Sequence, residues 1–174
     1  MSRVVSSPAL PVAHFVLRAL VIGNWLYGAA LLVLLVFMPH EQWIMRSFKL
    51  SPSPEAARFV MAMRAIVILG IAAVPANYIV LKRLLEIVDT VRSGDPFVAA
   101  NAARLRTVAW ALLALQLLSM AIDAISRTIS TPAHPVHLDA GFSITGWLAV
   151  LLTFLLARVF AEGASMRDDL AGTV

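Results

Sequence analysis

Apolar residues fill four long stretches of the chain that hold no ionisable side chain. The stretches cover residues 19–38, 65–81, 107–122 and 140–157. Each is near the roughly 20 residues that a helix needs to cross about 30 Å of hydrocarbon. The pattern predicts an all-α, polytopic membrane protein with a single domain (1–174) that packs as a four-helix bundle. The expected transmembrane helices cover residues 16–38, 61–81, 107–127 and 140–160.

Local signals extend the second of these helices well beyond the bilayer. Ser53 and Pro54 form a helix cap followed by a first-turn proline, and Ser93 and Gly94 form a stop signal. A helix over residues 54–92 would be roughly 58 Å long, almost twice the hydrocarbon thickness. Its end must therefore project into water.

The third helix is expected to start beside that projecting end. Asp95 and Pro96 repeat the cap-then-proline signal, so the third helix should begin there. Residues 82–106 would then form a cytoplasmic helical hairpin, and 161–174 a cytoplasmic tail. Pro75 should bend the second helix in mid-membrane, because proline has no N–H to donate.

Composition supports the membrane assignment and gives an orientation. Of the 174 residues 60% are hydrophobic, against about 45–50% in soluble domains, and there is no cysteine to form a disulfide or a thiolate metal site.

Because cytoplasmic loops are enriched in Lys and Arg, we expect both termini in the cytoplasm. That side would carry Arg3, Arg18, Lys82, Arg83, Arg92, Arg104, Arg106, Arg158 and Arg167, and the other side Arg46, Lys49, Arg58, Arg64 and Arg127. The net charge of +4 is spread along the chain without a nucleic-acid-binding motif, so direct nucleic-acid binding is not expected.

Asp123 is the one acidic residue inside the apolar pattern, and it needs a partner because an unpaired charge in hydrocarbon is costly. Arg127, one turn further on, and Arg64, near the same end of the second helix, are the candidate partners. A structural ion pair is favoured over a proton or ion site, because the other polar groups within the spans are uncharged. Among these, Asn24 and Asn77 are expected to bridge helices or to line a cavity.

The outer connection holds His134, His137 and Asp139, which are ligand types that suit zinc, copper or nickel. A complete site would need a further ligand from His40, Glu41 or water. A solvated loop is the alternative interpretation and the default, because prolines make the segment irregular. No hydrolase, metalloprotease or phosphate-binding motif occurs, so neither an enzyme nor a cofactor is expected.

Two predicted cytoplasmic segments carry a family resemblance. The hairpin contains Arg92, Gly94, Asp95, Pro96, Phe97, Asn101, Arg104 and Arg106. Phe160 directly precedes the tail, which contains Gly163, Asp168 and Asp169 before Thr173-Val174. This order resembles the bacterial membrane proteins of the domain-of-unknown-function family numbered 2975. The resemblance implies four spans in the bacterial inner membrane and names no substrate. Members of that family often lie beside a gene for a small helix-turn-helix regulator.

These observations lead to two hypotheses of function. In the first, the protein is a non-enzymatic sensor or regulatory partner that signals to a cytosolic protein, such as a helix-turn-helix regulator. The acidic tail would dock on hairpin arginines, either to stabilise the fold or to present a surface. In the second, the protein is a small-ligand or ion-binding component, with a site between helices near Asp123, and it would work as a homo-oligomer.

Overall fold

The computed structural model describes residues 9–37, 54–94, 98–130, 138 and 140–171. The described residues form four helices, α1 (Ala9–Phe37), α3 (Pro54–Arg92), α4 (Ala99–Ile129) and α5 (Ile144–Ala171). All four are long and apolar enough to cross a membrane. For the described residues, the prediction of four helices able to cross a membrane is therefore confirmed.

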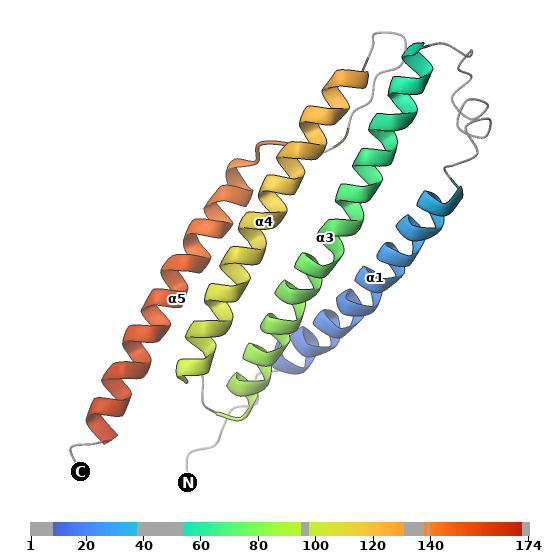
Figure 1. Cartoon of the computed structure of the whole chain (residues 1–174). Helices are drawn as coiled ribbons and strands as arrows, with labels where there is room; N and C mark the ends of the chain where they lie inside the picture. The colour runs from blue at the N-terminus through green and yellow to red at the C-terminus, as the bar shows by residue number, and fades with distance from the viewer. Residues whose placement is uncertain (1–8, 38–53, 95–97, 131–137, 139, 172–174) are drawn as a thin grey trace.

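Each described helix packs only against the described helix before or after it. Within the described residues, contacts join α1 to α3, α3 to α4, and α4 to α5. Figure 1 shows the four helices side by side in this order, with successive helices running in opposite directions. The start of α1, the end of α3, the start of α4 and the end of α5 lie at one end of the molecule, called the hairpin end below.

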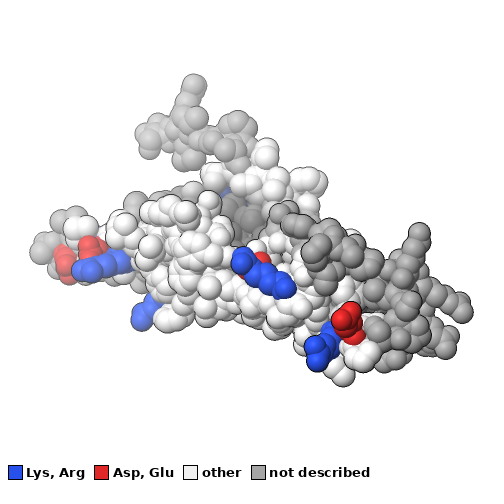
Figure 2. Space-filling view, turned by 90° about the horizontal axis from the view of Figure 1, so that it is seen from above, with Lys and Arg blue, Asp and Glu red and all other residues white. Residues whose placement is uncertain are grey.

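The described helices thus form an open row. In water, four helices must close a ring to hide their apolar faces, but in lipid an apolar outer face is stable. The outer helices are apolar on their exposed faces, with Phe15 and Leu26 of α1 and Leu151 and Leu155 of α5 all more than half exposed. Seen from above, most of the described surface carries no charge (Figure 2). Lys, Arg, Asp and Glu appear there in a few small groups.

Close packing between α1 and α3 depends on glycine. A Cβ at Gly28 of α1 would lie 3.0 Å from Val74 Cγ1 of α3, and a Cβ at Gly70 would lie 3.1 Å from a Leu31 methyl group. One turn from Gly28, Asn24 Nδ2 donates a hydrogen bond to the Val74 carbonyl at 3.1 Å. Small residues let the two backbones approach, and the amide then finds a partner on the adjacent helix.

Helix boundaries agree with some sequence signals and correct others. Helix α3 has the bounds that the cap and stop signals predicted, and it continues through Pro75. Helix α4 begins at Ala99 instead of near Asp95, because Val98 is extended (φ −95°, ψ 140°) and its carbonyl accepts the first hydrogen bond, from the Asn101 N–H. The predicted tail is helical as far as Ala171, as a continuation of α5.

Candidate functional site

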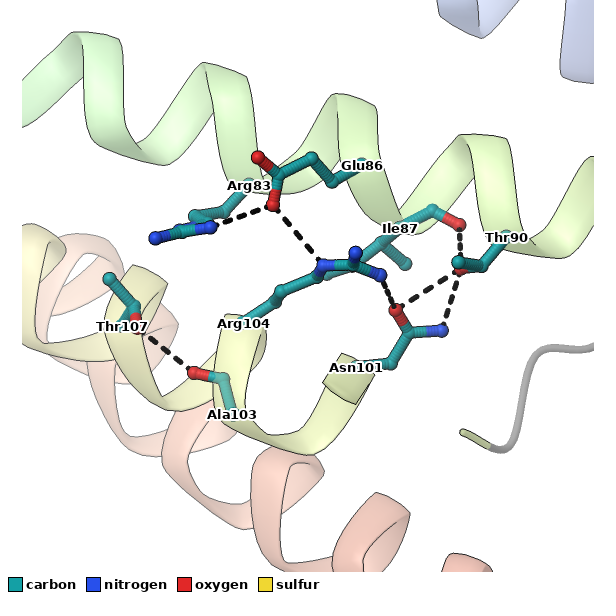
Figure 3. Close-up of polar contacts among 8 residues, drawn as sticks. All are labelled: Arg83, Glu86, Ile87, Thr90, Asn101, Ala103, Arg104 and Thr107. Atoms are coloured by element: carbon teal, nitrogen blue, oxygen red, sulfur yellow. Dashed lines mark hydrogen bonds and ion pairs between the residues drawn. The ribbon is translucent and has the colours of Figure 1, made fainter. Parts of the chain in front are cut away.

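A buried polar network joins α3 and α4 near the hairpin end. Asn101 of α4 is completely buried. Its Nδ2 donates to Thr90 Oγ1 of α3 at 2.8 Å, and its Oδ1 accepts from Arg104 Nη1 at 2.8 Å. The Thr90 hydroxyl lies within donating distance of the Ile87 carbonyl (2.7 Å) and of Asn101 Oδ1 (3.1 Å) (Figure 3). Every polar atom of the Asn101 side chain therefore has a partner, as burial requires.

Glu86 extends this network with charge. Its Oε2 accepts a hydrogen bond from Arg83 Nη1 at 2.8 Å within α3, and another from Arg104 Nε at 3.2 Å across the helix pair (Figure 3). Arg104 thus bridges the carboxylate of Glu86 and the amide of Asn101. These contacts lie beyond Leu81, the last residue of the charge-free stretch of α3. Water partly hydrates ions at that level, which lowers the free-energy cost of desolvating them.

Helical spacing explains how the sequence assembles the network. Glu86 and Thr90 are four residues apart in α3, and Asn101 and Arg104 are three apart in α4, so each pair occupies one helix face. The two faces oppose each other because α3 and α4 are antiparallel neighbours. We call Glu86, Thr90, Asn101 and Arg104 the hairpin network.

Helix α1 adds a polar contact at the same end. His14 Nε2 lies 3.4 Å from Asp89 Oδ1 of α3. One turn before Glu86, Lys82 Nζ lies 5.9 Å from the centre of the Tyr78 ring, and that ring stands 5.5 Å from the Trp25 ring of α1. Aromatic rings and basic residues are typical of the boundary between apolar and polar parts of a membrane protein.

The hairpin and tail residues selected from the sequence are only partly brought together. Arg92 and Gly94 are exposed at the end of α3, and Gly94 has the positive φ (88°) of a helix stop. Asp95, Pro96 and Phe97 lie outside the described residues. Arg106 is exposed on α4, and Gly163 is half-buried on α5.

The ion pairs that the structure shows for the proposed docking groups do not join the tail to the hairpin. In the tail, Glu162 Oε1 accepts from Arg158 Nε of its own helix at 2.9 Å. On the hairpin, Arg104 is engaged by Glu86. The Asp168 side chain lies outside the described structure, and Asp169 belongs to the last turns of α5. Docking of the acidic tail on hairpin arginines therefore stays a prediction.

At the opposite end, Asp123 pairs with Arg127 of the same helix, with Arg127 Nε donating to Oδ2 at 2.9 Å. The acid also packs against Gly141, where φ is +113° and an added Cβ would lie 2.8 Å from Asp123 Cγ. The Gly141 N–H donates to Ser119 Oγ at 3.0 Å, and its carbonyl accepts from Gln116 Nε2 at 3.2 Å. One face of α4 thus holds the backbone that leads into α5.

The other intramembrane candidates belong to α1 and α3. Arg64 is half-buried in α3, and Asn24 reaches the backbone of Val74 near the middle of that helix. Asn77 is half-buried in α3, and no hydrogen bond to it is found within the described structure. His134, His137 and Asp139 lie outside the described residues, as do His40 and Glu41. No group of three or more His, Cys, Asp or Glu gathers in the part of the chain that is described.

A comparison with known protein families assigns the chain to one of them. A family model described as "Protein of unknown function (DUF2975)" matches residues 38–174. The chain belongs to the DUF2975 family. The matched region contains the whole of α3, α4 and α5, and with them the hairpin network, and it starts after the last residue of α1. No curated protein and no solved structure matches the chain.

Sequence reasoning missed two members of the network within this DUF2975 region. Glu86 and Thr90 were not selected, although their four-residue spacing inside the predicted hairpin is a usable signal. Gly141 was also missed, because its role depends on a positive φ and on the proximity of Asp123, which only the structure reveals. The DUF2975 protein is a multi-pass integral membrane protein. The ion pairs of its described residues lie towards the ends of the helices.

Proposed function

We propose that this DUF2975 protein is a non-enzymatic membrane protein that acts as a sensor or regulatory partner of a cytosolic protein, such as a helix-turn-helix regulator. The hairpin end would be its contact surface. The observation that carries the proposal is the buried Asn101 of the hairpin network. It fixes α3 against α4 beyond the apolar stretches, and so preorganises a polar surface at the hairpin end.

Charge distribution supports a cytoplasmic position for this end. Arg83, Arg92, Arg104 and Arg106 belong to it, and so does Lys82. A bacterial inner membrane retains such Lys- and Arg-rich segments on its inner side. Both termini would then also be cytoplasmic, within reach of a soluble regulator.

A structural role of the ionisable groups supports the non-enzymatic part of the proposal. Glu86 accepts from two guanidinium groups, which stabilise its ionised form and make it a poor proton acceptor. The alternative of a ligand or ion site at Asp123 has less support, because that carboxylate already pairs with Arg127 and packs on Gly141.

The test is affinity capture of the tagged full chain from its native membrane in mild detergent, followed by mass spectrometry. Arg92 is exposed at the hairpin end, so Arg92→Glu changes the proposed surface without touching the hairpin network. Arg127→Glu is the matched control at the opposite end of α4. A cytosolic protein captured by the wild type and by Arg127→Glu but lost with Arg92→Glu supports the proposal. If no cytosolic protein is enriched, or if all forms capture the same set, the proposal is wrong.

A further inference from the structure

A groove of about 420 Å³ lies between α4 and α5, on the side of these helices nearer the hairpin end. Ala102 and Ala103 of α4 and Ala157 and Ala161 of α5 line it, so its walls are formed by short side chains. Its volume falls in the range of sites for small organic ligands, about 300–1,000 Å³. The rest of its lining consists of two arginines and one phenylalanine.

The two arginines stand at the same level relative to the apolar stretches. Arg106 directly precedes the charge-free stretch 107–122 of α4, and Arg158 directly follows the stretch 140–157 of α5. Because α4 and α5 are antiparallel neighbours, both guanidinium groups belong to one boundary between hydrocarbon and polar surroundings. Phosphate groups of phospholipids occupy that boundary.

Aromatic rings lie one turn deeper than each arginine. Trp110 is four residues after Arg106, and Phe154 is four residues before Arg158. The two rings meet edge to face, with centroids 5.4 Å apart and an interplanar angle of 88°. Phe154 lines the groove, so the groove passes from a cationic part to an apolar part along the direction of the membrane normal.

The cationic part keeps a positive charge. Arg158 Nε donates to Glu162 at 2.9 Å, but the Arg158 side chain is 79% exposed, so its other donors are accessible to a ligand. Arg106 is exposed, and no ion pair is found for it within the described residues. Two guanidinium groups against one carboxylate leave the groove complementary to a single anion.

We propose that this groove binds an anionic phospholipid. Arg106 and Arg158 hold the headgroup phosphate, the alanines leave room for the glycerol backbone, and an acyl chain follows Phe154 towards the bilayer interior. The apolar lining and the boundary position favour a lipid over a free phosphate ion. The inference is independent of the proposed regulatory function, since it requires no protein partner.

Native mass spectrometry of the full chain in mild detergent tests the proposal. The probes are phosphatidylglycerol and phosphatidylcholine, with inorganic phosphate as the free anion. We expect one phosphatidylglycerol to be retained in preference to phosphatidylcholine. Arg106→Gln with Arg158→Gln should weaken that binding by roughly 10-fold or more, since one basic residue near a lipid headgroup contributes about fivefold.

Arg127→Gln is a matched control, because Arg127 has the same exposure (78%) and the same i,i+4 pair with an acid, at the other end of α4. It should leave phosphatidylglycerol binding unchanged. An equal loss in this control shows unspecific attraction and overturns the site. So does equal retention of both lipids, or displacement of phosphatidylglycerol by inorganic phosphate at constant ionic strength.

A second variant fills the groove without changing its charge. Ala161 is exposed and lines the groove, so Ala161→Phe occupies the space without entering the buried contacts of α5. It should reduce phosphatidylglycerol retention several-fold. Ala149→Phe, at an exposed position of α5 outside the groove, should not. Undiminished binding to Ala161→Phe overturns the proposal even if the arginine variants fail to fold.

Discussion

A hydrogen bond joins Asn101 to Thr90 across the two longest described helices, with Asn101 Nδ2 donating to Thr90 Oγ1 at 2.8 Å. Apolar contacts allow helices to slide and rotate with little change in energy, but a fully buried amide accepts only one arrangement. This pair therefore fixes the register of α4 against α3. The same register brings Arg104 to Glu86.

Replacement of Asn101 should be costly. Asn101→Ala removes one partner of the Thr90 hydroxyl and the partner of one Arg104 donor, and we expect a loss of about 1–3 kcal/mol in the free energy of unfolding. Thermal unfolding in detergent, followed by circular dichroism, measures it. Thr107→Ala is the control, because the exposed Thr107 hydroxyl bonds only the Ala103 carbonyl of its own helix and should contribute less than about 0.5 kcal/mol. Equal losses for the two variants would contradict the assigned role of Asn101.

A larger side chain at Gly28 should destabilise the fold. Gly28→Leu places a side chain where Val74 Cγ1 already stands 3.0 Å from the expected Cβ, so α1 must separate from α3 and the Asn24 bond to the Val74 carbonyl must break. We expect a loss of about 1–3 kcal/mol, read from the thermal unfolding midpoint. At Gly23 an added Cβ has no neighbour within 4 Å, and Gly23→Leu should be neutral or stabilising. Val74→Ala should partly restore the Gly28→Leu variant. If Gly23→Leu is equally damaging, close packing at Gly28 is not the cause.

Gly141 should be more sensitive than Gly94, although both have a positive φ. Alanine at Gly94 (φ 88°) meets open space, so only backbone strain of about 1–2 kcal/mol is expected. Alanine at Gly141 (φ 113°) adds a collision with Asp123 Cγ at 2.8 Å. The unfolding free energies of the two variants provide the comparison. Asp123→Ala should relieve part of the Gly141→Ala loss, and an unchanged loss in the double variant would argue against the collision.

Labelling of single introduced cysteines can test the proposed orientation of the helices in the membrane, because the natural chain has no cysteine. Ser93 at the hairpin end and Thr128 at the other end of α4 are both exposed. In intact cells, a membrane-impermeant maleimide should label Thr128→Cys but not Ser93→Cys, and permeabilisation should expose Ser93→Cys. The reverse pattern would place the termini outside and exclude a cytosolic partner at the hairpin end.

Hydrophobic patterning predicted what depends on local sequence. The bounds of α3 followed from Ser53, Pro54 and the stop at Gly94, since caps and stops act within a few residues. The start of α4 did not follow from Asp95, because the extended backbone of Val98 delays the helix. For Asp123 the sequence offered two arginine partners, and the structure shows an ion pair with Arg127, the one in the same helix. The contact of that acid with Gly141 joins residues that no periodicity connects.

The groove between α4 and α5 could not be predicted from the sequence either. Arg106 and Arg158 each mark the edge of an apolar stretch, which is visible by counting. That they share one groove depends on the pairing of α4 with α5, and the size of the groove depends on the alanines that meet there. The open row of the described helices could not be predicted for a related reason. Periodicity reveals which helices are apolar but not whether a partner helix or lipid covers each face.

The open row has a consequence for biosynthesis. Since each described helix contacts only the one before or after it, every contact between helices becomes available as soon as the later helix emerges. Assembly can thus follow synthesis step by step, without waiting for a distant segment to close a ring. Loss of an outer helix, α1 or α5, would break one helix–helix interface and leave the other two in place.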